Sequence, residues 1–430
     1  MYSSLGLLFK AYGLKTTAIK IDPYLNVDPG TISPHEHGEV YVLGDGSETD
    51  LDMGNYERFI GINLCRANNI TTGQIYTEVI QRERKGAYLG KTVQIVPHIT
   101  NHIEERILTA SQNTLEDGNY PDIVIVELGG TVGDMESEPY LYAISQFESR
   151  NNVNVCVVGV GLLINNNGEL KTKPLQHAVK ELRRHSISPD ILCVRCDIDI
   201  ANDEFPLTLR DKIAGSCNIQ KNAIIVSGKV KSIYEVPKML QEQNMHEYIC
   251  RKLNRLWNET YKPNFENYTR ILNHISMQHK FPIVKVAIIA KYTGTPDTYL
   301  SLIRALEHAS FELNLSLEYT FIDSERFDAS QLEQYTHILV PGGFGVRGIE
   351  GKLSAIKYAR NTKTPFLGIC LGLQLFVIEH CRGVLGLTDA NSTEFDPNTS
   401  NPVVQHLSEY GEELVKQLGG TMRLGNYTTR

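Results

Sequence analysis

The sequence predicts two α/β domains, each built around a doubly wound parallel sheet. Three observations support this fold class. Strand-like apolar runs alternate with amphipathic helical segments, and the runs are too uniformly apolar to have one solvated face. The length of 430 residues also suits two or three domains. We therefore expect helices on both faces of each sheet.

The first domain is expected at residues 1–250. Amphipathic segments such as 99–112 and 174–186 separate its apolar runs. The expected strands are 16–22, 92–97, 122–128, 153–161, 190–196 and 223–228. Residues 251–282 are polar and carry little strand signal, which predicts a helical linker.

The second domain is expected at residues 283–430 and repeats the same alternation. Helices are expected near 297–313 and 350–361. The expected strands are 284–292, 315–323, 337–343 and 366–370. The last of these runs directly into a glycine-flanked cysteine.

Composition excludes several classes of function. The net charge of −8 and the pI near 5.9 argue against a general nucleic-acid binder. No apolar run approaches the ~20 residues that span a bilayer, so no membrane partner is expected. Eight scattered cysteines predict a reducing, cytoplasmic location. Cys193 and Cys196 lie three apart in an expected strand, on opposite faces, which favours ordinary strand cysteines over a metal or redox pair.

The stretch Gly368-Ile369-Cys370-Leu371-Gly372 has the cysteine form of a nucleophile elbow, in which a strand turns sharply into a helix. A second glycine loop, "VPGGFG", ends 27 residues before Cys370 at Gly343, which is the length of a βαβ unit. Both loops then lie at the carboxyl edge of one sheet, where sites form in α/β folds. Cys370 would attack a carbonyl carbon, with backbone N–H groups stabilising the oxyanion. The alternative is a buried cysteine in a tight turn.

Acidic residues gather in the loops after two strands of the first domain. The segment 20–59 is rich in acids, glycines and prolines, and Glu127 follows four apolar residues and precedes a Gly-Gly turn. Mg²⁺ typically takes one or two protein carboxylates together with phosphate oxygens and waters. Either segment alone fits a solvated acidic loop, but together they predict a metal–nucleotide site.

Lys171 and Lys173 precede a helix that opens near Pro174. Two lysines beside the free N–H groups of a helix start make an anion site. In an acidic chain this is the local basic cluster that phosphate binding requires. The alternative is a solvated loop.

These segments, in this order, resemble the CTP synthase family over nearly the whole chain. The specific motifs are "IDPYLNVDPGT", "DLDMGNYERF", "ELGGTVGDMES", "PGGFGVRGIEGK" and "PFLGICLGLQL". The resemblance implies a P-loop-NTPase-like amidoligase domain and a class I glutamine amidotransferase domain. It implies the reaction as well: ATP phosphorylates the 4-oxygen of UTP, and ammonia from glutamine displaces that phosphate to give CTP. It further implies Mg²⁺, GTP as allosteric activator, CTP as inhibitor, and a homotetramer able to form filaments.

The resemblance also assigns residues. Asp52 and Glu127 would hold Mg²⁺, and Cys370 would be the glutaminase nucleophile. The glutamine pocket would comprise Gly343, Leu371, Gly372, Leu373, Gln374 and Glu394. The nucleotide sites would comprise Lys20, Asp52, Asp134, Met135, Glu136, Lys171, Thr172, Lys173, Pro174, Leu175, Gln176, Lys212, Lys229 and Val230.

The sequence departs from the family pattern at several points. It contains no Gly-x-x-x-x-Gly-Lys-Ser/Thr pattern, so the amidoligase domain is expected to lack its first strand and P-loop, with neighbouring strand edges exposed. The family's base is a histidine followed two residues later by glutamate. After Cys370 only His380 and His406 occur, neither in that pattern, and both are interpreted as surface residues.

Two substitutions bear on nucleotide affinity. Leu175 replaces a threonine of the family's "KTKPTQ" motif, and Lys229 stands where the family usually has an aspartate. The chain is therefore expected to be a CTP synthase shortened at both ends and impaired in making CTP from glutamine by itself. The alternatives are a non-catalytic UTP- or CTP-binding or co-assembling paralogue, and an incomplete gene model.

Overall fold

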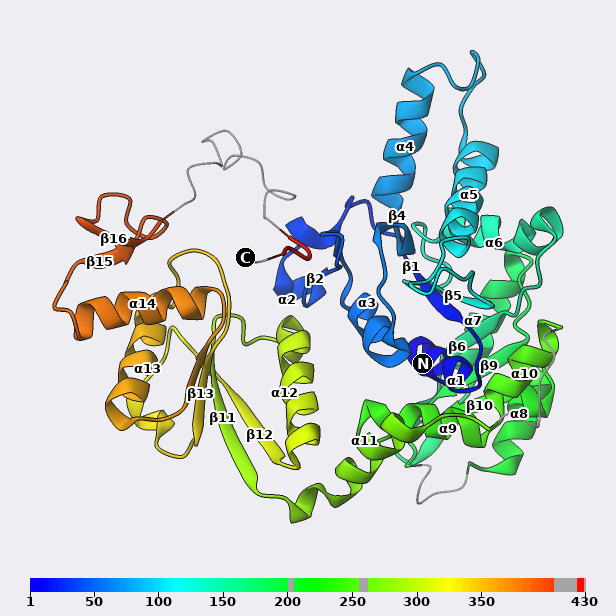
Figure 1. Ribbon diagram of the computed structural model, residues 1–430. Coiled ribbons are helices and arrows are strands. Elements are labelled where there is room, and N and C mark those ends of the chain that lie inside the picture. Colours follow the sequence, from blue (N-terminus) through cyan, green and yellow to red (C-terminus); the bar gives the residue numbers. More distant parts are fainter. Residues whose placement is uncertain (200–204, 255–261, 406–423, 429–430) are drawn as a thin grey trace. The chain divides into compact units, whose positions relative to one another are not determined.

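The computed structural model describes residues 1–199, 205–254, 262–405 and 424–428, and the chain divides into two compact units (Figure 1). Unit 1 comprises Met1–Pro29, Tyr41–Leu272 and Leu424–Arg430, and unit 2 comprises Gly30–Val40 and Asn273–Arg423. The predicted α/β class is confirmed in both units, because parallel strands form the sheets of each.

Unit 1 contains two three-stranded parallel sheets. The first has the order β4 (Asn69–Thr71), β1 (Thr16–Asp22), β5 (Ile123–Leu128). The second has the order β10 (Ile224–Ser227), β9 (Ile191–Arg195), β6 (Val158–Leu162). The β1 strand is central and buried at all seven positions, which include the polar and charged residues Thr16, Thr17, Lys20 and Asp22.

One hydrophobic cluster joins the two sheets beneath helix α1 (Tyr2–Ala11). Leu8 and Phe9 of α1 pack in the same core as Ile123 of β5, Ile191 of β9 and Ile225 of β10. The two sheets share this core but, over the described ranges, are not hydrogen-bonded to each other. Strand β5 is an edge strand of the first sheet, and β6 is an edge strand of the second. Only one of the six β5 residues is fully buried, whereas the whole of β1 is.

Short hairpins and helices complete unit 1. The hairpins pair β2 (Tyr41–Val42) with β3 (Glu48–Thr49), and β7 (Ile164–Asn166) with β8 (Glu169–Lys171). The main helices are α3 (Leu51–Tyr56), α4 (Thr72–Arg84), α5 (Thr100–Ser111), α6 (Glu138–Asn151), α7 (Lys173–Arg184), α8 (Leu207–Cys217), α9 (Val236–Glu242) and α10 (Met245–Lys252). The α11 helix (Glu266–Met277) runs from unit 1 into unit 2.

The expected strand at 92–97 is wrong. Residues 91–94 are irregular, and a short helical turn follows at Ile95–Ile99, in the connection between α4 and α5 (Figure 1). Ile95 is 50% exposed and Val96 is 41% exposed, so this apolar run does not pack into a sheet. The expected strand at 153–161 begins late, at Val158.

Unit 2 has a four-stranded parallel sheet of order β12 (Ser316–Asp323), β11 (Ile283–Ala290), β13 (His337–Val340), β14 (Phe366–Gly368). Helix α12 (Leu300–Leu313) connects β11 to β12, and α13 (Ile349–Thr362) connects β13 to β14. Helix α14 (Leu371–Gly383) follows β14, and a small sheet pairs β15 (Ala390–Ser392) with β16 (Asn401–Val404). One core of the unit lies between the sheet and helices α13 and α14, and a second packs Ile288 and Leu339 of the sheet against Leu306 of α12.

Unit 2 also includes a distant piece of chain, Gly30–Val40, which carries the short helix α2 (Pro34–His37). Glu39 accepts a hydrogen bond of 2.6 Å from the backbone N–H of Ser301 at the start of α12. The His35 ring packs edge-on against Tyr292, with centroids 5.5 Å apart. The domain boundaries expected from the sequence do not place this segment with residues 283–430, and those boundaries stay predictions.

None of the helices in the described part of the chain is both long enough and apolar enough to cross a membrane.

Candidate functional site

Strand register places Lys20 beside Glu127. In the parallel pair of β1 and β5, Lys20 lies opposite Glu127, near the carboxyl ends of both strands. Asp22, two residues on, lies on the same face of β1 as Lys20 because strand side chains alternate. Asp50 caps α3 by accepting a 2.8 Å hydrogen bond from the Asp52 N–H, which fixes the start of that helix.

Four carboxylates therefore surround one buried ammonium, and we call these five residues the Lys20 cluster. The Lys20 Nζ is hydrogen-bonded to Asp52 and lies 3.5 Å from Glu127, 3.8 Å from Asp22 and 3.8 Å from Asp50. The Lys20 side chain is only 7% exposed. Asp52, at 33%, is the most accessible carboxylate of the cluster, which leaves it open to a ligand.

The electrostatics of the Lys20 cluster favour a charged lysine. Burial lowers the pKa of Lys20, but the surrounding carboxylates, Glu127 foremost, outweigh burial and raise that pKa well above its usual value. Burial raises the pKa of Glu127, which also accepts a hydrogen bond from the Tyr56 hydroxyl. Burial likewise raises the pKa of Asp22. The cluster thus holds more carboxylates than its single ammonium neutralises.

The expected metal ligands, Asp52 and Glu127, both contact the same ammonium nitrogen. They are therefore close enough for one cation to lie between them. Within the residues that the structure describes, no group of three or more His, Cys, Asp or Glu side chains is arranged to hold a metal ion by itself. Two carboxylates suit Mg²⁺ only when phosphate oxygens or waters complete its coordination shell.

One of the expected pyrimidine-nucleotide lysines pairs with Glu169. Lys171, at the end of the β7–β8 hairpin, forms a 2.6 Å ion pair with Glu169. This hydrogen bond lowers the pKa of Glu169, and the charge of Lys212 on α8 contributes in the same direction. Lys212 is therefore near enough to Glu169 to act on its charge, although it lies 41 positions after Lys171 in the sequence.

Helix α7 begins at Lys173, two residues after Lys171. Thr172 precedes the helix, and its hydroxyl accepts a 3.0 Å hydrogen bond from the Gln176 side chain. Lys173 and Pro174 form the first turn, as expected for a helix with proline near its start. Leu175 is fully buried in the core, against Gly161. Its side chain therefore belongs to the protein core and does not face a nucleotide.

The remaining expected nucleotide residues lie in two loops. Asp134, Met135 and Glu136 are exposed in the turn after β5, where the Asp134 side chain accepts a hydrogen bond of 3.3 Å from the Thr131 N–H. Lys229 is exposed after β10, with its N–H bonded to the Ile198 carbonyl at 2.7 Å. Val230 packs against the core beneath α1. No hydrogen bond or ion pair among the described residues joins Lys171 or Lys212 to the Lys20 cluster.

In unit 2, the turn at Cys370 has the backbone of a nucleophile elbow. Cys370 has φ 53° and ψ −110°, a strained conformation for a residue other than glycine. A Cβ at Gly372 would lie 2.0 Å from the Val340 carbonyl oxygen, and one at Gly368 would lie 2.6 Å from the Gly372 backbone. Both glycines are therefore required for the turn to pack between β13 and α14.

Cys370 is exposed at the start of α14, next to the glycine loop that follows β13. The position of a Cβ at Gly342 lies 3.8 Å from the Cys370 Sγ. Leu371 is buried, but as the first residue of α14 its N–H has no partner within the helix. The elbow therefore presents a thiol, a helix start and a glycine loop together.

The expected glutamine-pocket residues differ in accessibility. Leu373 is 57% exposed and Gln374 is half-buried on the first turn of α14. Glu394 is exposed and accepts a 3.1 Å hydrogen bond from the Gly345 N–H, which ties it to the same glycine loop as Gly343. The structure thus brings Cys370, Gly343 and Glu394 to one edge of the sheet.

His380 is exposed near the end of α14 and stacks on Phe376. Ten residues of helix place it about 15 Å along the axis from Cys370. His406 lies outside the described residues.

Sequence analysis missed two buried lysines beside the glycine loop. Lys291 follows β11 and is 4% exposed, and Lys352 of α13 is 0% exposed. Lys352 falls between Ile349, Leu353 and Ile356, on the core-facing stripe of its helix. A lysine within an apolar helical stripe was the available signal.

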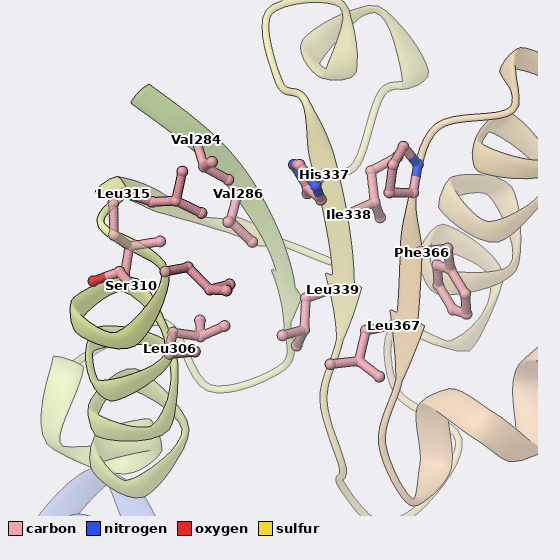
Figure 2. Close-up of a pocket in the computed structure, with 14 residues that line it drawn as sticks. Val284, Val286, Leu306, Ser310, Leu315, His337, Ile338, Leu339, Phe366 and Leu367 are labelled. Atoms are coloured by element: carbon pink, nitrogen blue, oxygen red, sulfur yellow. The ribbon is translucent and has the colours of Figure 1, made fainter. Parts of the chain in front are cut away.

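The apolar pocket of unit 2 is not this site. Figure 2 shows it between α12 and the sheet, with a volume of about 220 Å³. The sheet residues that line this pocket, including Val284, His337 and Phe366, lie toward the amino-terminal ends of their strands. Cys370, in contrast, lies beyond the carboxyl end of β14. Ser310 and His337 are its only polar side chains, and no thiol or carboxylate lines it.

Comparison with known proteins identifies the family. A model described as "CTP synthase N-terminus" matches residues 1–255, and one described as "Glutamine amidotransferase class-I" matches residues 295–429. The chain belongs to the CTP synthase family. Members of this family are glutamine-hydrolysing ligases.

Individual relatives match almost the full chain. The CTP synthase of Hydrogenobaculum sp. (strain Y04AAS1) is 47% identical, over 99% of this chain and 77% of that protein. CTP synthase 1 of Homo sapiens is 46% identical, over 99% of this chain and 74% of that protein. Among solved structures, the Trypanosoma brucei CTPS glutaminase domain with bound acivicin is 35% identical, covering 30% of this chain and 53% of that chain, with a TM-score of 0.29.

Proposed function

We propose that this chain performs the CTP synthase reaction, the ATP-dependent amination of UTP to CTP with ammonia from glutamine. The observation that carries the proposal is the presence of two chemically distinct sites in one chain. The Lys20 cluster suits phosphate and metal chemistry, and the elbow at Cys370 suits acyl transfer.

The Lys20 cluster is proposed to bind the phosphates of ATP. Lys20 would neutralise phosphate charge, while Asp52 and Glu127 would hold Mg²⁺ together with phosphate oxygens. When bound, Mg²⁺ supplies charge that stabilises the transferring phosphoryl group. The two carboxylates fit this role because they already share one cation, the Lys20 ammonium.

The pyrimidine nucleotide is proposed to bind around the start of α7. Lys171, Lys173 and Lys212 supply positive charge there, beside the free N–H groups of the helix. The other proposed contacts are the backbone of Leu175 and the side chains or backbone of Lys20, Asp134, Met135, Glu136, Thr172, Pro174, Gln176, Lys229 and Val230.

CTP would inhibit the reaction by competing with UTP for the same lysines. GTP is proposed as an allosteric activator.

The elbow is proposed to hydrolyse glutamine. The Cys370 thiolate would attack the side-chain carbonyl carbon, and the N–H of Leu371 together with an N–H of the Gly342–Gly343 loop would stabilise the resulting oxyanion. Glu394 would bind the amino-acid end of glutamine, with Gly372, Leu373 and Gln374 lining the pocket. A homotetramer able to form filaments and a cytoplasmic location also belong to this proposal.

The test compares ammonia donors. CTP formation from UTP and ATP is measured with glutamine and, separately, with an ammonium salt. Cys370→Ala should abolish only the glutamine-dependent reaction, whereas Asp52→Asn should lower both by at least about 100-fold, because both need the phosphoryl step. Saturable UTP and CTP binding with no synthesis from either donor would contradict the proposal and favour a non-catalytic nucleotide-binding role.

A further inference from the structure

The glycine loop beside Cys370, residues 341–345, is bound from within the protein by two buried lysines. Lys352 Nζ donates a hydrogen bond of 3.3 Å to the Pro341 carbonyl. Lys291 Nζ donates to the carbonyl of Phe344 and, at 2.9 Å, to that of Gly345. The lysines thus bind three carbonyls within five residues.

These contacts determine which way the loop's N–H groups point. In a trans peptide, the C=O and the following N–H point in opposite directions. The Phe344–Gly345 peptide shows the effect, because Lys291 binds its carbonyl while its N–H donates to Glu394. By the same geometry, Lys352 holds the Pro341 carbonyl inward and directs the Gly342 N–H away from the protein interior.

Gly342 lies next to the nucleophile. The position of a Cβ on this residue is 3.4 Å from the Cys370 Cβ and 3.8 Å from its Sγ. These are ordinary van der Waals distances, so Gly342 lies directly beside the thiol. The Gly342 N–H is therefore a donor close to the atom where an oxyanion would form.

The burial of Lys352 is electrostatically unfavourable. Burial, and then the charge of Lys291, lower the pKa of Lys352 to about 8, and a Cys370 thiolate opposes this change. Burial also lowers the pKa of Lys291, with Arg347 contributing. Among the described residues, no carboxylate lies within 4 Å of either ammonium. A stabilising role alone does not explain two such lysines beside one loop.

We propose that Lys352 and Lys291 are positioning residues of the glutaminase, which orient the peptides of loop 341–345 so that its N–H groups serve the oxyanion and Glu394. This inference rests on the proposed glutamine hydrolysis and names residues outside the expected catalytic set. The lysines act through the loop backbone and do not contact the substrate.

Two thiol reagents separate loop orientation from thiol reactivity. The γ-aldehyde analogue of glutamine accepts the Cys370 thiolate at its carbonyl carbon: a C–S bond forms, the C=O pair moves to oxygen, and the alkoxide takes a proton from water. Iodoacetamide is displaced instead: a C–S bond forms, the C–I bond breaks and iodide leaves. Only the first reaction generates an oxyanion.

The experiment measures both rates at Cys370 in the full chain, by mass spectrometry of the labelled or protected peptide. Lys352→Met and Lys291→Met should slow aldehyde addition by about 10- to 100-fold, since misaligned oxyanion donors reduce rates on this scale. Alkylation by iodoacetamide should change by less than about threefold. Lys357→Met, an exposed lysine of the same helix, is the matched control and should change neither rate.

Each other outcome overturns a specific statement. If both rates fall equally in Lys352→Met, the lysine acts on the thiol or on folding, and the positioning role is wrong. If aldehyde addition is unchanged in both variants, the loop does not need the lysines. If the unsubstituted chain is alkylated by iodoacetamide but does not add the aldehyde, glutamine hydrolysis itself is refuted, and this inference with it.

Discussion

Lys20 of unit 1 and Lys352 of unit 2 are both buried at the carboxyl edge of a parallel sheet, yet their surroundings are opposite. Four carboxylates surround Lys20, whereas the Lys352 ammonium, among the residues that the structure describes, is hydrogen-bonded to the Pro341 carbonyl and has a second lysine nearby. The pKa of Lys20 is accordingly raised and that of Lys352 is lowered. A buried lysine is therefore electrostatically favourable in unit 1 and electrostatically unfavourable in unit 2.

The difference separates two uses of a buried charge. In the Lys20 cluster the ammonium compensates excess negative charge and occupies a place suited to another cation. Beside the glycine loop, no carboxylate in the described part of the chain lies within 4 Å of the Lys352 ammonium, whose hydrogen bond orients the Pro341 peptide. Removing a compensating charge is strongly destabilising, whereas removing an uncompensated one can be neutral or stabilising.

The largest expected effect is the loss of Lys20. Lys20→Met should lower the free energy of unfolding by roughly 3–5 kcal/mol, because it removes the ammonium that four carboxylates surround. Lys15→Met is the matched control, since Lys15 pairs with Asp117 at 3.8 Å on the surface and should contribute under about 1 kcal/mol. Urea denaturation measures both, and equal midpoints would mean that the cluster does not depend on Lys20.

The pH dependence of stability should distinguish the two lysines next. The folded pKa of Lys352, about 8, lies below its ordinary value of 10.5, so between these values the unfolded chain holds a proton that the folded chain has lost. Stability attributable to Lys352 therefore rises with pH across this window, by up to about 3 kcal/mol. The Lys20 contribution has the opposite sign and is lost only above its unfolded pKa.

Denaturation of the unsubstituted chain and of Lys352→Met, compared at several pH values from 8 to 10.5, isolates this effect. The free energy of unfolding of the unsubstituted chain, relative to that of Lys352→Met, should increase as the pH rises. A difference that stays constant would show that Lys352 titrates normally despite its burial.

A smaller effect is expected for Lys352→Met at neutral pH. The variant loses one hydrogen bond, worth about 1 kcal/mol, but also removes a buried, uncompensated charge. Its free energy of unfolding should therefore fall by no more than about 1 kcal/mol or even rise, while aldehyde addition at Cys370 slows. A loss as large as that of Lys20→Met would remove the contrast between the two sites.

The smallest expected effect concerns Lys291. Its electrostatic surroundings are intermediate between those of Lys20 and those of Lys352. Burial lowers its pKa, but the charges of Glu394 and Glu325 partly oppose that change. Glu394→Gln should lower the Lys291 pKa further and change the unfolding free energy by under about 1 kcal/mol, because Glu394 is exposed. NMR titration of ¹⁵N-labelled lysine measures the pKa, and an upward shift would contradict the assigned interaction.

Strand ends and glycine loops made much of the molecule predictable from sequence. The α/β class followed from uniformly apolar strands, and the elbow at Cys370 followed from glycine spacing, because both patterns have one main backbone solution. The pairing of Lys20 with Glu127 was beyond sequence analysis, since strand register depends on packing between distant segments. The sequence placed Glu127 in an acidic site with the segment 20–59, and Lys20 was assigned to the nucleotide site only through the family resemblance.

Two other features of the candidate sites were not predicted from the sequence, because they depend on helical phase and on the burial of a charge. Leu175 was assigned to the nucleotide site from its place in a motif, but the phase of α7 turns its side chain into the core. Lys352 was overlooked because a lysine next to apolar helix positions usually extends its ammonium to solvent. Only the tertiary structure shows that here the ammonium remains inside.

The segment Gly30–Val40 has a consequence for how the protein is made. Its carboxylate at Glu39 bonds to Ser301, a partner 262 positions later in the chain. At roughly 5–20 residues per second, a ribosome needs on the order of tens of seconds to cover that distance. Residues 30–40 therefore emerge long before the rest of unit 2, and their final docking must be a late step in biogenesis.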